Sequence, residues 1–301
     1  MTLTARSGRQ LIVNGDDFGL SPQVNAGILH AHRHGILTDT SLMITAPAWE
    51  EAVALATATP SLSVGLHLTL MQGRAALPPH LLPAVTDPVG NFSPNATLAG
   101  LHYFFSRQAR EQVRTECQAQ LEKFLATSLT LTHVDGHLNI HMHPVVLDIL
   151  LELAREYGIR AMRVTRENLA TTLALDARHS LRKRWESVIF TCLSRAAEKK
   201  LRANGIVFPD ALFGLHQSGD FNERYLLDLL PRLREGVTEL YCHPSFLPCR
   251  EVQYWTPTYR RDVELAALAS SAVRAAVTDQ RVVLVSYRNL SADGDSLSGE
   301  R

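Results

Sequence analysis

Short runs of apolar and β-branched residues alternate with longer amphipathic stretches along most of this chain. The apolar runs predict strands at about 10–15, 41–46, 62–70, 129–135, 160–165, 206–212, 237–242 and 281–287. The amphipathic stretches predict helices in most of the intervals, and such alternation is typical of a parallel sheet with crossover helices. We therefore predict the α/β class, with a TIM-like (β/α)-barrel that is either distorted or one strand short.

One segment interrupts this alternation. Residues 71–104 contain Pro78, Pro79, Pro83, Pro88 and Pro94, which is typical of a loop. The segment follows the third predicted strand, and long loops at the catalytic face of a barrel commonly carry specificity. We predict one barrel domain over residues 1–290 with a lid insertion at 71–104. The Ser-, Gly- and Asp-rich residues 291–301 are predicted to be a disordered tail.

Composition excludes several classes of protein. The chain has 301 residues and is 46% hydrophobic, which is enough for one large core. It has 30 basic and 30 acidic residues, so its formal net charge is zero and gives no reason to expect nucleic-acid binding. It lacks an apolar signal core at its start and an apolar run of about 20 residues, which argues against stable membrane insertion and for a cytoplasmic protein. Its four cysteines lack C-x-x-C spacing and are predicted to be reduced thiols.

Acidic and histidine side chains follow three of the predicted strands. Asp16 and Asp17 end the first strand, His67 lies at the end of the third, and His137 follows the fourth. Carboxyl ends of barrel strands meet on one face, so these groups are expected to share a site. An Asp-His-His set suits Zn²⁺, Mn²⁺ or a similar divalent ion and leaves positions open for water and substrate.

The two adjacent carboxylates pose a geometric problem. Neighbouring residues of a strand point to opposite faces, so Asp16 and Asp17 can serve one site only through a local turn. Gly15 and Gly19 are candidates for permitting that turn. One carboxylate would then bind the metal while the other accepts a proton from water, as metal-assisted hydrolysis requires.

Simpler interpretations compete with these. An acidic pair after a strand is often a helix cap, and a single histidine in an apolar strand is often a hydrogen-bonded core residue. The cluster from His133 to His143 is harder to explain as packing, because desolvation of so many polar groups is costly. Within it His137 is the metal-ligand candidate, and Asp135 is a candidate for fixing an imidazole tautomer. The other three are predicted to orient ligands or contact substrate: His133, His141 and His143.

Two further polar groups are expected to lie outside the site. His30, His32 and His34 fall on a predicted helix and are expected to be surface residues. Arg182, Lys183 and Arg184 are expected to form a solvated face, although a basic patch near a lid could meet anionic groups.

Four motifs follow one another along the chain: Asn14-Gly15-Asp16-Asp17-Phe18-Gly19, Gly65-Leu66-His67-Leu68, His133-Val134-Asp135-Gly136-His137 with His141-x-His143-Pro144, and Cys242-His243-Pro244. Together they resemble the motifs of the YdjC-like carbohydrate deacetylases. The similarity runs from about residue 10 to 288. Ser41-Leu42-Met43, the stretch from His133 to Val164 and the tract around His243 resemble the hopanoid-biosynthesis-associated (HpnK-type) subgroup.

This resemblance implies a metal-dependent deacetylase of acetamido sugars on a barrel related to the NodB-type deacetylases. It implies that Asp17, His67 and His137 hold a divalent ion, Mg²⁺ or Zn²⁺, and that Asp16 is the base. His243 becomes the candidate general acid. It further implies an acetamido-sugar substrate, lipid-linked in the hopanoid subgroup, and a homodimer. Gly15 where Ala is frequent, and Leu138-Asn139 where a further histidine often stands, depart from the common family form.

Three alternatives remain at this point. A chito-oligosaccharide deacetylase would use the same residues on a soluble sugar. Another metal-dependent hydrolase, acting on an ester or phosphoester, would use the same ligands. A non-catalytic sugar- or metal-binding protein needs no base, and the presence of Asp16 argues against it.

Overall fold

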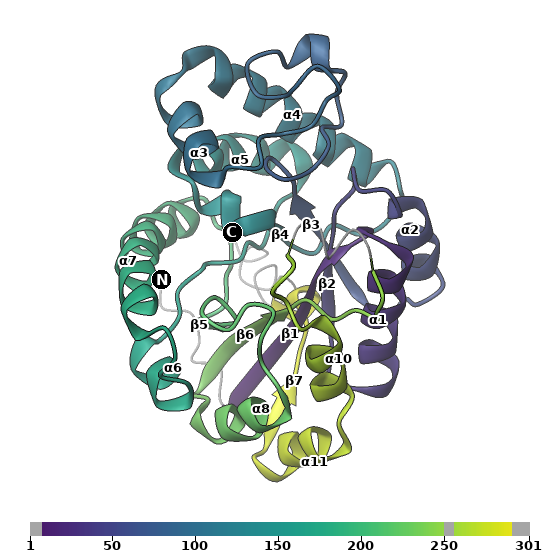
Figure 1. Ribbon diagram of the computed structural model, residues 1–301, viewed down its shortest axis with the longest axis vertical. Coiled ribbons are helices and arrows are strands. Elements are labelled where there is room, and N and C mark those ends of the chain that lie inside the picture. Colours follow the sequence, from purple (N-terminus) through teal and green to yellow (C-terminus); the bar gives the residue numbers. More distant parts are fainter. Residues whose placement is uncertain (1–7, 250–255, 291–301) are drawn as a thin grey trace, which may run out of the picture.

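A parallel β-sheet forms the centre of the computed structural model, which describes residues 8–249 and 256–290. The strand order is β4-β3-β2-β1-β6-β5, and β7 pairs with the first residues of β1 (Figure 1). The strands are β1 (Arg9–Phe18), β2 (Asp39–Leu42), β3 (Ser63–Leu68), β4 (Val134–Gly136), β5 (Ala211–Phe213), β6 (Gly236–Cys242) and β7 (Val282–Leu284). Every pair is parallel, so the carboxyl ends of the strands meet at one edge.

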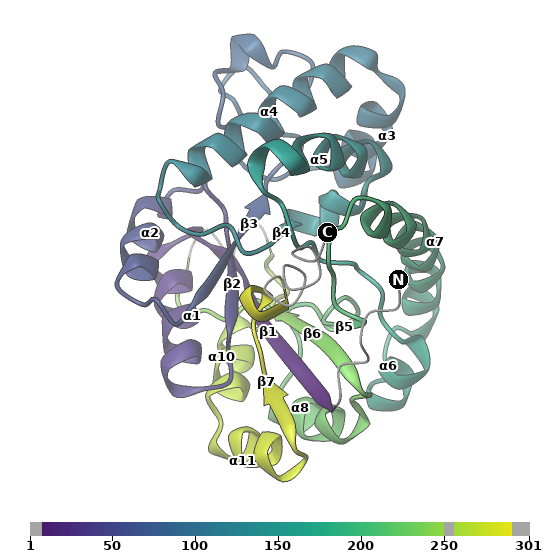
Figure 2. The same cartoon turned by 180° about the vertical axis from the view of Figure 1, so that it is seen from behind.

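Helices cover the sheet on its flanks and at both ends. In both views α1 and α2 lie on one flank and α6 and α7 on the other, while α3, α4 and α5 lie beyond β3 and β4 (Figure 1, Figure 2). The helices are α1 (Pro22–His34), α2 (Trp49–Thr57), α3 (Ala96–Phe105), α4 (Arg107–Leu125), α5 (Pro144–Tyr157), α6 (Leu169–Leu175), α7 (Ser180–Ala203), α8 (Glu223–Leu229), α10 (Arg261–Ala269) and α11 (Ser271–Asp279), with 3₁₀ turns η1 (Pro79–Leu81), η2 (His137–Met142) and η3 (Leu230–Arg232).

Local sequence signals explain several helix ends. Ser21 accepts a hydrogen bond from the backbone N–H of Val24 at 3.2 Å, and Pro22 occupies the first helical position of α1. Proline is favoured there because that N–H would be unpaired in any case. At the carboxyl end of α5, Gly158 adopts the left-handed conformation, with φ 68°, and ends the helix. These residues fix where α1 begins and where α5 ends.

The ring of strands is closed only by isolated bridges, so the structure fits a distorted barrel. The predicted strand at 160–165 is wrong as a regular strand, because its pairing is limited to the bridges Met162–Val134 and Ala161–Val207. The prediction at 206–212 is largely wrong too, since β5 begins only at Ala211. Pro209 offers no backbone N–H, which interrupts a ladder at that point.

The segment at 71–104 packs beside α4. The backbone N–H groups of Ala76 and Leu77 donate to the carboxylate of Glu116 at 2.7 and 3.1 Å, and Glu116 is fully buried. The hydroxyl of Tyr103 donates to the carbonyl of Leu70 at 2.7 Å. These contacts fasten the segment to the α4 end of the molecule, and its role as a lid stays a prediction.

Candidate metal centre

A bulge at the end of β1 solves the geometric problem posed by Asp16 and Asp17. Gly15 pairs with Thr40 of β2, but Phe18 pairs with Leu42, so one extra residue lies on the β1 side. Asp17 itself adopts the left-handed conformation, with φ 68°. The turn therefore lies at Asp17, one of the candidate ligands. A non-glycine residue held in this region often marks a functional position.

The two neighbouring glycines have other roles. A Cβ at Gly15 would lie 2.9 Å from Cδ1 of Leu37, so this position permits close packing of α1 and the chain after it on β1. Gly19 has φ 94°, which few side chains tolerate, and leads the chain from β1 toward α1. The turn that brings both carboxylates to one site is therefore made by Asp17 itself, and not by Gly15 or Gly19 as predicted.

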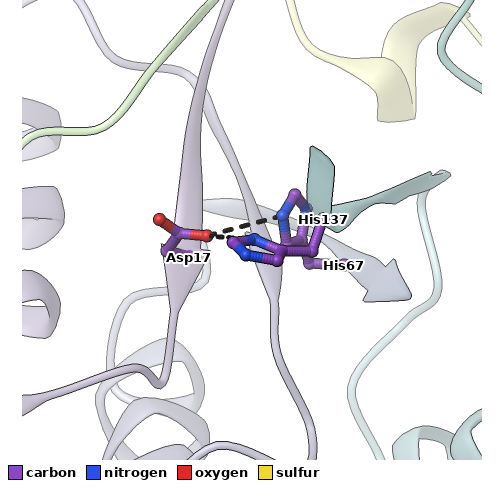
Figure 3. Close-up of side chains that lie close together, drawn as sticks. All are labelled: Asp17, His67 and His137. Carbon is purple, nitrogen blue, oxygen red and sulfur yellow. Dashed lines mark hydrogen bonds and ion pairs between the residues drawn. The ribbon is translucent and has the colours of Figure 1, made fainter. Parts of the chain in front are cut away.

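Three predicted metal ligands meet at the carboxyl edge of the sheet. Oδ1 of Asp17 lies 3.1 Å from Nδ1 of His137 and 3.5 Å from Nε2 of His67 (Figure 3). The three come from the end of β1, the end of β3 and the first residue after β4, and all are buried. One ligand atom from each lies within 4.8 Å of the others. Two imidazoles and one carboxylate are a donor set that fits a divalent ion such as zinc.

Buried partners orient this set. Asp135 accepts a hydrogen bond from Nδ1 of His67 at 2.8 Å, which leaves Nε2 facing Asp17. Arg261 binds the other oxygen of Asp17, with 2.6 Å between Nη2 and Oδ2. Burial alone would raise the pKa of Asp17, but Arg261 and His137 hold it well below its usual value. Such outer partners fix the tautomer and orientation of ligands.

Asp16 lies beside the three ligands in a different environment. Arg163 donates two hydrogen bonds to Asp16, from Nη1 to Oδ2 at 2.8 Å and from Nη2 to Oδ1 at 2.7 Å. Asn14 donates to the same Oδ1 at 2.7 Å. A second possible ligand set, formed by Asp16, His67 and Asp135, also lies within 4.8 Å. Arg163 and His67 already bind the oxygens of Asp16 and Asp135, whereas Arg261 leaves Oδ1 of Asp17 facing the two rings, so we favour the set that contains Asp17.

Sequence reasoning missed Arg163. Its side chain is fully buried, and its guanidinium reaches three carboxylates on three strands: Asp16, Asp135 and, at 2.9 Å, Glu239. Burial would lower the pKa of Arg163, but these carboxylates raise it well above its usual value. The available signal was an arginine inside an apolar run predicted to be a strand, since such a charge needs buried partners.

His243 lies at the end of β6, as expected, and faces the same space. Its backbone N–H donates to Glu264 at 2.7 Å, while its Nδ1 finds no hydrogen-bond partner among the described residues. Burial lowers the pKa of His243 to about 4, so its ring is uncharged at neutral pH.

The other predicted histidines are not among the three candidate ligands, although Nε2 of His133 lies 3.9 Å from Oδ2 of Asp135, the partner of His67. His133 is buried and stacks on the ring of Tyr287, with 3.9 Å between centroids. His141 is buried, and burial lowers its pKa to about 3. His143 precedes α5 and packs edge-on against Tyr103 at 6.4 Å. On α1, His34 is exposed, whereas His32 is half-buried and bonds the carbonyl of Leu37 at 2.8 Å.

A cavity of about 580 Å³ opens above the centre. Asp16, Asp17, His67, His137 and His243 all contribute to its wall. The remainder of the wall comes mainly from three segments: 176–186, 215–220 and 256–259. None of residues 71–104 lines it, and neither do Asp135, His133, His141 and His143.

The basic triplet of α7 is not simply a solvated face. Lys183 is buried, and its Nζ donates to the backbone carbonyl and the carboxylate of Asp176 at 2.7 and 3.2 Å. Arg182 and Lys183 both line the cavity, while Arg184 is exposed. The expectation of three solvated cations is therefore wrong for Lys183, because its ammonium pairs with a carboxylate inside the wall.

The position of His133 gives a prediction on stability. A Cβ built on Gly65 would overlap the His133 ring, so Gly65→Ala must displace a ring that is stacked on Tyr287. We expect a loss of about 1–3 kcal/mol in the free energy of unfolding, as for overpacking a core. Gly100→Ala is the matched control, because its Cβ would meet only His143 at an ordinary 3.6 Å. Urea denaturation measures both, and equal stability of the two variants would contradict the packing argument.

The fold and the site together define a class: a barrel-like α/β protein with an Asp-His-His centre at the carboxyl edge of its parallel sheet. The family model described as YdjC-like protein matches residues 10–279. The chain belongs to this family.

Named relatives and a solved structure agree with that membership. The chain is similar to carbohydrate deacetylases of Brevibacillus brevis (31% identity over 283 residues, 93% of this chain and 99% of the relative) and Geobacillus stearothermophilus (31% over 284 residues, 93% and 97%). A crystal structure from Enterococcus faecalis, of a protein provisionally assigned to cellobiose-phosphate cleavage, matches with a TM-score of 0.73 and 27% identity, covering 95% of this chain and all of that one.

Proposed function

We propose that this protein is a metal-dependent deacetylase that hydrolyses the acetamido group of an N-acetylated amino sugar. The observation that supports this most directly is the meeting of two kinds of group in one cavity: three ligand side chains, and a separate carboxylate, Asp16, whose partners are Arg163 and Asn14. Hydrolysis by an activated water needs both. The carbohydrate deacetylases among the relatives support the class of substrate.

Asp17, His67 and His137 would hold the ion. Two imidazole nitrogens among three protein ligands favour Zn²⁺ over Mg²⁺, which prefers oxygen ligands. When bound, the ion would polarise the acetamide carbonyl and lower the pKa of a water molecule. Asp135 and Arg261 act on the ligands: the first orients His67, and the second keeps Oδ2 of Asp17 engaged so that Oδ1 faces the two rings.

Asp16 and His243 would move the protons. Asp16 accepts a proton from the attacking water, and the two hydrogen bonds from Arg163 hold the Asp16 carboxylate in place. The C–N bond of the amide breaks as the nitrogen gains a proton, for which His243 is the donor we propose. Because burial keeps His243 uncharged at neutral pH, the proton that it gives to the nitrogen would be the one that Asp16 took from the water, passed to His243 before the C–N bond breaks. The products are acetate and the free amino sugar.

For the natural substrate we propose an N-acetylglucosaminyl hopanoid. The support is the resemblance of the Ser41-Leu42-Met43 and His133 to Val164 tracts to the hopanoid-associated subgroup. One wall residue of the cavity offers an apolar surface to such a substrate: Leu138 is 39% exposed, and its backbone lies in the left-handed region, with φ 53°. A soluble chito-oligosaccharide is the alternative substrate of the same reaction.

The test offers three groups of substrates to the zinc-loaded protein and measures acetate release from acetamido glycosides and acetyl esters, and phosphate release from phosphoesters. We expect turnover of the acetamido glycosides, with a higher kcat/KM on acetylglucosaminyl-bacteriohopanetetrol than on chitobiose. Preference for chitobiose would contradict the hopanoid proposal and leave the deacetylase standing. Turnover of esters or phosphoesters alone would contradict the deacetylase itself.

A further inference from the structure

The outer face of α7 carries a stripe of large apolar side chains. Leu181, Trp185, Val188 and Ile189 have 75%, 72%, 58% and 55% of their surface exposed. Their spacing of i, i+4, i+7 and i+8 puts all four on one side of a helix. Single exposed apolar side chains are common on protein surfaces, but a group of them on one face usually marks an interaction surface.

The exposed charges of the same helix all have one sign. They are Arg182, Arg184, Arg195, Lys199 and Arg202. The two acids of α7 are not fully exposed, and both are paired: Glu198 binds Arg166 at 2.8 Å, and Glu186 lies 3.1 Å from Nδ1 of His216. The surface that α7 presents is therefore apolar and cationic together. This combination, with a tryptophan, is typical of helices that lie in the interface of an anionic bilayer.

The stripe adjoins the mouth of the cavity. Arg182, Lys183 and Glu186 of the same helix line the cavity wall, and so does the exposed Leu138. In both views α3 lies on the same side of the molecule as α7 (Figure 1, Figure 2). That helix adds more exposed apolar side chains: Leu98, Leu101, Phe104 and Phe105.

We propose that α7 docks this protein on the surface of an anionic phospholipid bilayer, with the cavity mouth at the level of the head groups. Over residues 8–249 and 256–290, no helix is sufficiently long and apolar to span a bilayer, so the binding is peripheral. Docking goes beyond the proposed function and does not require it. If the substrate is lipid-linked, docking would bring its sugar to the cavity.

A second copy of the chain is a less favourable occupant of this face. In a two-fold symmetric dimer the same patch meets itself, so the arginines of one α7 would face those of the other. The two acids of α7 are only partly exposed and already have partners within the chain, Glu186 with His216 and Arg182 and Glu198 with Arg166, so they do not compensate the arginines of a second copy. Anionic lipid head groups supply the opposite charge, while the interfacial region accepts Trp185 and its apolar neighbours.

The experiment is co-sedimentation of the full chain with vesicles of phosphatidylcholine, either alone or with one third phosphatidylglycerol. We expect binding to the anionic vesicles, weakened by salt, and at least about tenfold weaker binding to phosphatidylcholine alone. Trp185→Gln with Ile189→Gln should lower binding to the anionic vesicles by at least about tenfold. Arg184→Glu with Arg195→Glu should remove the preference for them.

Matched controls lie elsewhere on the molecule. Val283→Gln, which changes an apolar side chain 56% exposed on β7, and Arg274→Glu on α11 should bind as the unchanged protein does. Melting temperature and turnover of soluble chitobiose check that the α7 variants are folded, independently of vesicle binding. Lack of binding by the unchanged protein, or equal binding by the α7 variants, would overturn the proposal. So would conversion of a dimer to a monomer by the Trp185 and Ile189 changes, because a second copy would then cover α7.

Discussion

Replacement of Asp16 by Asn should leave metal bound and lower kcat by about 10²–10⁴-fold, the usual contribution of general acid–base catalysis. His67→Ala and His137→Ala should instead lose both metal and activity, because each removes one of the two imidazoles that face Oδ1 of Asp17. Metal content by mass spectrometry and acetate release measure the two properties separately. His80→Ala, an exposed histidine on η1, is the control for changing any histidine.

The opposite result would identify the other ligand set. If Asp16→Asn abolishes metal binding while activity per bound metal stays intact, Asp16 is a ligand and not the base. The set of Asp16, His67 and Asp135 would then hold the ion. His67 belongs to both sets, so His137→Ala is the variant that separates them.

Arg163→Met should lower the free energy of unfolding by about 3–5 kcal/mol, the usual result of removing one partner from a buried ion pair. The change would leave the carboxylates of Asp16, Asp135 and Glu239 together without a cation. Carboxylates left in this way hold their protons to higher pH in the folded protein than in the unfolded chain. The loss in free energy of unfolding caused by Arg163→Met should therefore be smallest at acidic pH and grow as the pH rises.

Two further variants sharpen this test. Arg163→Lys keeps the charge but cannot repeat the paired hydrogen bonds to Asp16, so it should recover only part of the stability and leave kcat lowered. Arg166→Met is the matched control three residues away, where the side chain is 40% exposed and bound to Glu198. It should change stability by about 1 kcal/mol or less. Urea unfolding at several pH values measures all three, and equal effects at positions 163 and 166 would contradict a structural role for Arg163.

The sequence alone determined the class of fold and the candidate ligands. Apolar runs separated by amphipathic stretches predict parallel strands, and the positions of β1, β3 and β6 agree closely with the prediction. Asp16, Asp17, His67 and His137 could be grouped because they lie at or near the ends of apolar runs, and carboxyl ends of parallel strands meet at one edge. The choice of Asp17 as the ligand and Asp16 as the base came from the family resemblance. The functional assignment needed more, since several hydrolases and binding proteins would show the same ligands. The resemblance of four ordered motifs supplied it.

Only the tertiary structure decided how Asp16 and Asp17 serve one site and what surrounds them. The bulge in β1 depends on its pairing with β2, and the left-handed conformation of Asp17 has no signature in the residue itself. Arg163 acquires its role from carboxylates 147, 28 and 76 positions away in sequence, which no local pattern encodes. Which face of α7 lines the cavity and which stays exposed also depends on what packs against it. Periodicity reports local backbone geometry, whereas burial and charge pairing are set by long-range contacts.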